Sequence, residues 1–134
     1  MEISVDWQGD LEFKSSLPSG HSLTADGSKD SDNNGPSPME MLLNGVAGCT
    51  GIDVVMILDK MKEDLRDLSM EVKAERAEEY PQRFTDIHIT YKLKGKELDK
   101  KKVERAINLS EEKYCSASAS LNANITSDYE IEEV

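Results

Sequence analysis

The sequence predicts an α+β fold, in which strands and helices occur as separate blocks along the chain. Three observations support this class: alternating apolar residues over the first 25 positions, a long apolar helix pattern after 36, and further alternation between 68 and 93. The predicted order is three strands, a long helix, two strands, a second helix and a last strand. With 134 residues, the chain has room for a single domain, 1–134.

An antiparallel β-meander is predicted at the N-terminus. Apolar and polar residues alternate in 3–7, 11–13 and 21–25, and turn residues separate these stretches. Residues 26–37 consist mainly of Asp, Ser, Asn, Gly and Pro, which cannot form a buried face. We therefore expect a mobile loop there.

A long central helix is predicted from Ser37 to about Met61. Its start is marked by a capping serine, a proline at the first helical position and a glutamate, Glu40, three residues after the cap. Apolar residues surround its first half, so we expect it to be enclosed on several sides. Each interior glycine lowers helix stability by about 1 kcal/mol relative to alanine, so several together need a structural reason. Close approach of another backbone at Gly45, Gly48 and Gly51 is the natural one.

A β-hairpin and a second helix are predicted in the C-terminal half. The hairpin strands lie at 68–76 and 84–93, and Gly95 is expected to close the hairpin. Asp99 is a suitable N-cap for the second helix, and a last strand covers 124–132. The inner face of this helix is predicted to contain Val103, Ala106, Ile107, Ser110 and Tyr114.

The composition argues against several classes of partner. The chain has 16 Lys and Arg against 27 Asp and Glu, a net charge of −11, which disfavours binding to nucleic-acid phosphates. The N-terminal residues lack the basic and apolar pattern of a secretory signal, so we expect a cytoplasmic protein. No membrane partner is expected, because four polar residues interrupt the apolar helix: Glu40, Asn44, Asp53 and Asp59.

The two cysteines, Cys49 and Cys115, are the residues best suited to chemistry. They lie 66 positions apart (115 − 49), each on or beside a predicted helix, so only tertiary folding can bring them together. In a reducing compartment such thiols are reactive or inert more often than bridged, and inert packing is the alternative for both. The pair favours a redox couple over a metal site, and no spacing of His and Cys resembles a zinc site. We expect no metal and no cofactor.

Three segments together resemble the OsmC and organic-hydroperoxide-resistance superfamily, specifically its short OsmC-like branch. They are Ser37–Leu43, Gly48–Val55 and Arg105–Ser116. The resemblance implies an OsmC-like intertwined homodimer with the two long helices at its centre, sheets of both subunits around them, and active sites at the interface.

The resemblance also implies a thiol peroxidase that acts on organic hydroperoxides. Cys49 would attack the peroxide bond and become a sulfenic acid, Cys115 would condense with it to a disulfide, and an external dithiol reductant would restore both thiols. The family's usual Cys-Pro-x-Ser occurs here as Cys115-Ser116-Ala117-Ser118, without the proline.

Glu40 is the third candidate catalytic residue, because the family carries a catalytic glutamate near the start of this helix. The glutamate directly follows the proline in the peroxidase branch, whereas here it comes one residue later and also completes the capping box. Glu40 and Cys49 are nine residues apart, on opposite sides of one helix and about 13.5 Å apart along it. Only a second copy of the helix would bring Glu40 near Cys49.

The peroxidase branch also carries an arginine in the meander, and this chain has none before Arg66. Four cations remain open as replacements: Lys14, Arg76, Arg83 and Arg105. Asp53, one helical turn after Cys49, would disfavour a thiolate if it pointed the same way. The missing arginine favours an alternative, a non-enzymatic small-ligand-binding or redox-responsive protein.

Overall fold

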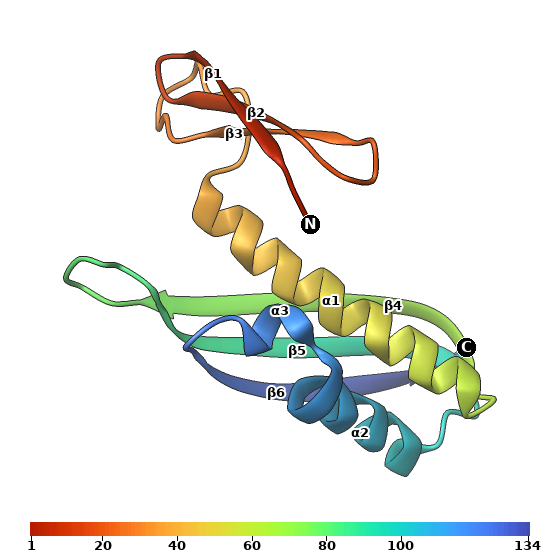
Figure 1. Cartoon of the computed structure of the whole chain (residues 1–134). Helices are drawn as coiled ribbons and strands as arrows, with labels where there is room; N and C mark the ends of the chain where they lie inside the picture. The colour runs from red at the N-terminus through yellow and green to blue at the C-terminus, as the bar shows by residue number, and fades with distance from the viewer. The chain divides into compact units, whose positions relative to one another are not determined.

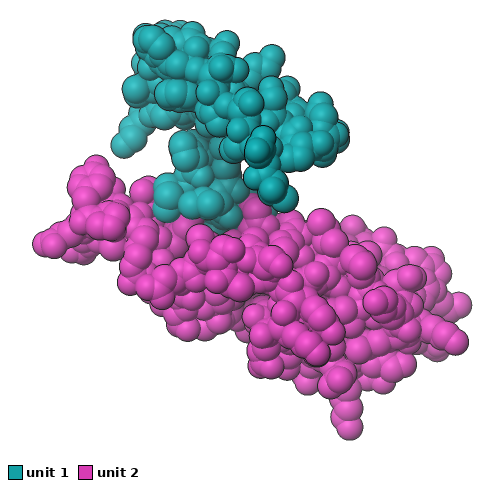
Figure 2. All heavy atoms as spheres, viewed as in Figure 1, with its two compact units in different colours: residues 1–44 teal, residues 45–134 magenta.

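A computed structural model describes all residues, 1–134, and confirms the α+β order of elements (Figure 1). The elements are β1 (Ser4–Gly9), β2 (Glu12–Ser16), β3 (Ser22–Asp26), α1 (Pro38–Lys60), β4 (Asp64–Arg76), β5 (Phe84–Lys96), α2 (Lys100–Leu109), a π-helical turn (Ser110–Tyr114), α3 (Ser116–Ala119) and β6 (Asn124–Glu133). Two compact units, 1–44 and 45–134, divide the chain, and their boundary falls within α1 (Figure 2). The assignment of one domain to the whole chain stays a prediction.

The first unit contains the predicted meander as an antiparallel sheet of order β1-β2-β3. The loop after β3 makes hydrogen bonds to the end of that strand, and its mobility stays a prediction. Asp26 is buried, and its carboxylate accepts hydrogen bonds from the backbone N–H groups of Ser28 at 2.8 Å and Asn34 at 3.0 Å. A carboxylate that accepts several backbone N–H groups holds a loop of polar residues in place without an apolar core.

The start of α1 matches the sequence prediction. The Ser37 backbone N–H donates to Glu40 Oε1 at 2.9 Å, and the Glu40 N–H donates to Ser37 Oγ at 3.2 Å. These reciprocal bonds form a capping box, with Pro38 at the first helical position.

The second unit is built on a three-stranded sheet with β5 in the centre. β4 pairs with β5 antiparallel, and β6 pairs with β5 parallel. Helices α1 and α2 lie on the same side of this sheet (Figure 1). Phe84 is buried at the start of β5, and from Ile87 on the buried residues alternate along the strand: Ile87, Ile89, Tyr91 and Leu93.

Helix α1 buries only one face within the chain. Its fully or nearly fully buried residues recur mostly four apart: Val46, Thr50, Gly51, Val54 and Leu58. An apolar stripe elsewhere on the helix stays exposed, with Ile52 at 62%, Val55 at 45% and Met56 at 54% of their accessible surface. The expectation that the helix is enclosed on several sides is therefore wrong for the single chain. By length and composition alone, α1 is long and apolar enough to cross a membrane, a property that core helices of soluble proteins share.

Within the chain, Gly45, Gly48 and Gly51 of α1 approach no other backbone, and close approach by a second copy stays a prediction. A Cβ at Gly45 or Gly48 would meet nothing within 4 Å. A Cβ at Gly51 would lie 2.7 Å from the terminal methyl of Met70, a flexible side chain of β4. Only Gly51 is thus explained by packing inside the chain.

Two local predictions in the second unit are wrong. Gly95 does not close the hairpin but lies inside β5 opposite Leu65, where a Cβ would meet the Asp64 backbone oxygen at 2.4 Å. Tyr114 does not face the core and is 49% exposed. The π-helical turn Ser110–Tyr114 explains this second error, because its wider turn shifts the helical periodicity from which the inner face was predicted.

Candidate functional site

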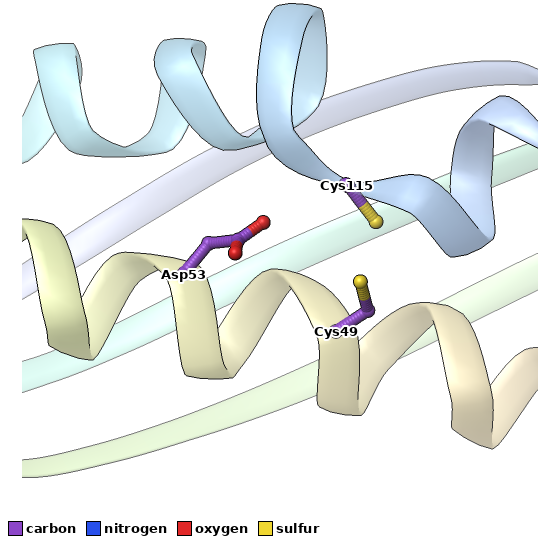
Figure 3. A group of neighbouring side chains, drawn as sticks. All are labelled: Cys49, Asp53 and Cys115. Carbon is purple, nitrogen blue, oxygen red and sulfur yellow. The ribbon is translucent and has the colours of Figure 1, made fainter.

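The fold brings Cys49 and Cys115 together, as the sequence analysis expected. Cys49 projects from α1 toward Cys115, which lies between the π-helical turn and α3 (Figure 3). The two Sγ atoms and one carboxylate oxygen of Asp53 all lie within 4.8 Å of one another. Both cysteines are free thiols. A disulfide has an S–S length of about 2.05 Å, so bond formation requires an approach of up to about 3 Å.

Cys115 is held by the backbone around it. Its N–H donates to the Ser110 carbonyl oxygen at 2.7 Å, and its Sγ accepts the Ser118 backbone N–H at 3.4 Å as the N-cap of α3. The side chain is buried at 4% exposure, whereas Cys49 is only partly buried. The accessible thiol is therefore Cys49, and Cys115 lies behind it.

Burial also controls the protonation of Cys115. It raises the pKa of the Cys115 thiol, the hydrogen bonds from Ser118 lower it in part, and the neighbouring Cys49 raises it further. A raised pKa keeps Cys115 in the neutral thiol form at neutral pH. Cys115 is thus better suited to react with an already oxidised partner than to attack a substrate first.

Asp53 is the third member of the cluster, and its side chain points the same way as Cys49 (Figure 3). Its Oδ2 accepts a hydrogen bond from Ser110 Oγ at 2.9 Å, and Ser110 is fully buried. Ser110 was expected only as a core position, because nothing in the sequence indicates its bond to a residue 57 positions away.

A buried polar network lies in the same unit. Glu111, next to Ser110 in the π-helical turn, accepts hydrogen bonds from Tyr91 Oη and Ser127 Oγ, both at 3.2 Å. Burial raises the pKa of Glu111, and these two bonds lower it in part. The Glu111-Glu112-Lys113 run is typical of a solvated helix surface, so nothing in the sequence singles out Glu111. The π-helical turn places Glu111 half-buried while Glu112 stays exposed.

The half-buried carboxyl of Glu111 predicts a pH dependence of stability. Because the folded-state pKa of Glu111 is raised, the unfolded chain loses this proton first, and this group's contribution to the free energy of unfolding falls as pH rises above about 4.5. Glu111→Gln removes this loss, so its stability relative to wild type should increase from pH below 4.5 to neutral pH. Chemical denaturation at both pH values measures the difference. The exposed neighbour substitution Glu112→Gln is the control, and an equal pH trend in both variants would contradict the assignment.

The remaining candidates lie elsewhere. Glu40 caps α1, and its catalytic role stays a prediction. Arg76 Nε donates to the Gln82 carbonyl oxygen, and Arg83 donates to that of Asn122, so both guanidinium groups have backbone partners. Lys14 lies exposed on β2.

Of the three candidate arginines, Arg105 is the one that lines a pocket together with Asp53. It lines a pocket of about 450 Å³ in the second unit, together with Asp53 and Lys60. The apolar lining consists of Met56, Ile57, Met61 and Leu109. A pocket with apolar walls and a few charged groups is typical of a small-molecule site.

The comparisons with known proteins agree with this architecture. The family model described as OsmC-like protein matches residues 30–130. The protein YhfA of Escherichia coli K12 is 41% identical over 133 residues, which cover 98% of each chain.

Solved structures show the same fold at lower identity. The OsmC-like protein of Mycoplasma pneumoniae superposes with a TM-score of 0.83 at 15% identity, covering 97% of this chain and 95% of that one. The organic hydroperoxide resistance protein OhrB of Bacillus subtilis has a TM-score of 0.62 at 17% identity, covering 96% of each chain. With a family match over most of its length and a relative 41% identical from end to end, the chain belongs to the OsmC-like protein family.

Proposed function

We propose that this protein is a thiol-dependent peroxidase that reduces organic hydroperoxides through Cys49 and Cys115. The observation that carries the proposal is the pair of free thiols within 4.8 Å, one partly exposed and one buried. This arrangement suits a nucleophile that meets the substrate and a resolving thiol behind it. The name of the Bacillus subtilis fold relative supports hydroperoxides as the substrate class.

The proposed reaction has three steps. The Cys49 thiolate attacks the outer oxygen of the hydroperoxide, the O–O bond breaks, and the alkoxide takes up a proton to leave as the alcohol. The sulfur is oxidised by two electrons to a sulfenic acid. The Cys115 sulfur then attacks the Cys49 sulfur, forming the disulfide and releasing water. An external dithiol reduces the disulfide and becomes a disulfide itself.

We further propose that the working form is a homodimer. On α1, the exposed stripe Ile52, Val55 and Met56 forms an apolar surface without a partner in the chain. In the first unit, the meander separately exposes the large apolar side chains of Val5, Trp7 and Phe13. A second copy would remove such surfaces from water. In that arrangement Glu40 of one chain would approach Cys49 of the other.

Disrupting the helix stripe tests the dimer. Ile52→Glu places a charge in the proposed contact, where an unpaired buried carboxylate is strongly unfavourable. The variant should elute as a monomer in size-exclusion chromatography with light scattering at a concentration where wild type is dimeric. Lys73→Glu, at an exposed position of β4, is the control and should remain dimeric. A monomeric wild type, or a dimeric Ile52→Glu, would contradict this part of the proposal.

The direct test of function is turnover of a model substrate. The reduced wild-type chain should consume tert-butyl hydroperoxide and cumene hydroperoxide in many cycles when dithiothreitol is present. Loss of peroxide is followed in a ferrous oxidation assay. If neither hydroperoxide is consumed above the rate with dithiothreitol alone, the peroxidase proposal is wrong.

A second candidate is a non-enzymatic protein that binds a small apolar ligand or responds to oxidants. The pocket of about 450 Å³ beside Asp53 favours it. This candidate predicts saturable binding of an apolar ligand to wild type and slow oxidation of the thiols without turnover.

A further inference from the structure

Asp53 has no role in the proposed peroxidase reaction, although the fold holds its carboxylate in a defined position beside the thiols. Its carboxylate lies within 4.8 Å of both Sγ atoms and is fixed by the fully buried Ser110. A carboxylate has about four lone-pair positions. The single hydrogen bond from Ser110 therefore leaves Asp53 free to accept a further donor or to bind a cation.

Three potential anions in so small a space repel one another when all are ionised. Two thiolates and one carboxylate carry three negative charges, and within 4.8 Å each charge disfavours the others. A bound divalent cation offsets most of this repulsion, because its two positive charges take the place of the two thiol protons and are shared by all three ligands. The cluster therefore has the charge pattern of a cation site.

The donor types select the cation. Two sulfurs and one oxygen are a donor set that Zn²⁺ accepts, whereas Mg²⁺ and Ca²⁺ prefer oxygen alone. Zinc binds Cys sulfur at about 2.3 Å and carboxylate oxygen at about 2.0–2.2 Å, which places tetrahedral donors about 3.5–3.8 Å apart. Because the observed separations are at most 4.8 Å, the cluster needs to contract by no more than about 1.3 Å.

We propose that Cys49, Cys115 and Asp53 form a three-ligand Zn²⁺ site in the reduced protein. The fourth coordination position would face a water molecule or a small ligand, as in zinc sites with three protein ligands. Ser110 orients Asp53 through its hydrogen bond, the role that groups around zinc ligands commonly have. Asp53 also lines the pocket of about 450 Å³ in the same unit.

Zinc binding is then linked to the redox state of the thiols. Each thiol must lose its proton to bind the metal, so binding releases protons and weakens as pH falls. The disulfide form has no thiolate to offer and does not bind. If the protein is the proposed peroxidase, Zn²⁺ also inhibits it by occupying the sulfur that attacks the substrate. That last consequence rests on the proposed function, but the site itself does not.

Metal binding is measured without any peroxide. The reduced full chain is titrated with Zn²⁺ against a chromogenic chelator, and with Co²⁺ to record the thiolate-to-metal absorption band. Wild type should bind one metal ion per chain and show this band. Cys49→Ser and Cys115→Ser should lose the band, and Asp53→Asn should keep it with weaker Zn²⁺ affinity. Ser110→Ala should weaken Zn²⁺ affinity by about 10- to 100-fold.

Two controls complete the experiment. Asp59→Asn changes an exposed carboxylate on the same helix and should bind as wild type does. The chain oxidised with diamide to the disulfide should bind no Zn²⁺. Binding that persists in Cys49→Ser or in the oxidised chain would overturn the proposal, and so would wild-type affinity in Asp53→Asn or no binding at all. Because these readouts need no turnover, failure of the zinc site and failure of the peroxidase are separate results.

Discussion

Replacing Cys49 with serine should abolish catalytic reduction of tert-butyl hydroperoxide. A serine hydroxyl does not ionise near neutral pH and cannot attack the O–O bond as a thiolate does. We expect the steady-state rate with dithiothreitol to fall by at least about a thousandfold, because loss of a nucleophile removes the chemical step itself. The measurement is the rate of peroxide loss at equal concentrations of wild type and variant.

The matched variant for this test is Cys115→Ser, which keeps the proposed nucleophile and removes the resolving thiol. It should consume about one equivalent of hydroperoxide per chain and accumulate a sulfenic acid at Cys49, which dimedone traps. Equal turnover in wild type and Cys49→Ser would contradict the role of Cys49. If Cys115→Ser consumes no hydroperoxide at all, Cys115 is the nucleophile instead.

Leu58→Ala should cause a large loss of stability. Leu58 is fully buried on the face of α1 that packs inside the second unit. Truncation of a fully buried leucine removes apolar contacts and leaves a cavity, at a cost of about 2–5 kcal/mol in the free energy of unfolding. Urea denaturation monitored by circular dichroism at fixed protein concentration gives this difference directly.

The control for this substitution is Asp59→Ala, at the next position of the same helix. Asp59 is exposed, so its replacement should change the free energy of unfolding by no more than about 0.5 kcal/mol. A cost below about 1 kcal/mol for Leu58→Ala would show that α1 is not packed as described. The fixed concentration matters, because the stability of a dimer depends on it.

The sequence predicted an element well where the residues that define it are close together in the chain. The capping box of Ser37 and Glu40 sets the start of α1 through bonds between residues three apart, so the sequence holds all the information. The order of elements follows from apolar periodicity in the same way. Gly95 was misplaced because its role depends on the backbone of the paired strand β4, which periodicity does not describe.

The candidate site was predicted in part. Family motifs indicated that Cys49 and Cys115 would meet, and the structure places their sulfurs together. The sequence placed Asp53 one helical turn after Cys49 but left the direction of its side chain open. That direction depends on a hydrogen bond from Ser110, which lies in a distant segment. Glu111 was missed because a π-helical turn, which sequence periodicity does not reveal, makes it half-buried.

The measurement that tests the central claim most directly is the mass of the protein after one equivalent of tert-butyl hydroperoxide. The reduced chain is treated in the absence of any other thiol, alkylated, digested and analysed by mass spectrometry. We predict a disulfide that links the peptides of Cys49 and Cys115, with a mass two hydrogen atoms below the sum of the two reduced peptides. Two alkylated cysteines after this treatment, or a disulfide only between like cysteines of two chains, would contradict the redox pair.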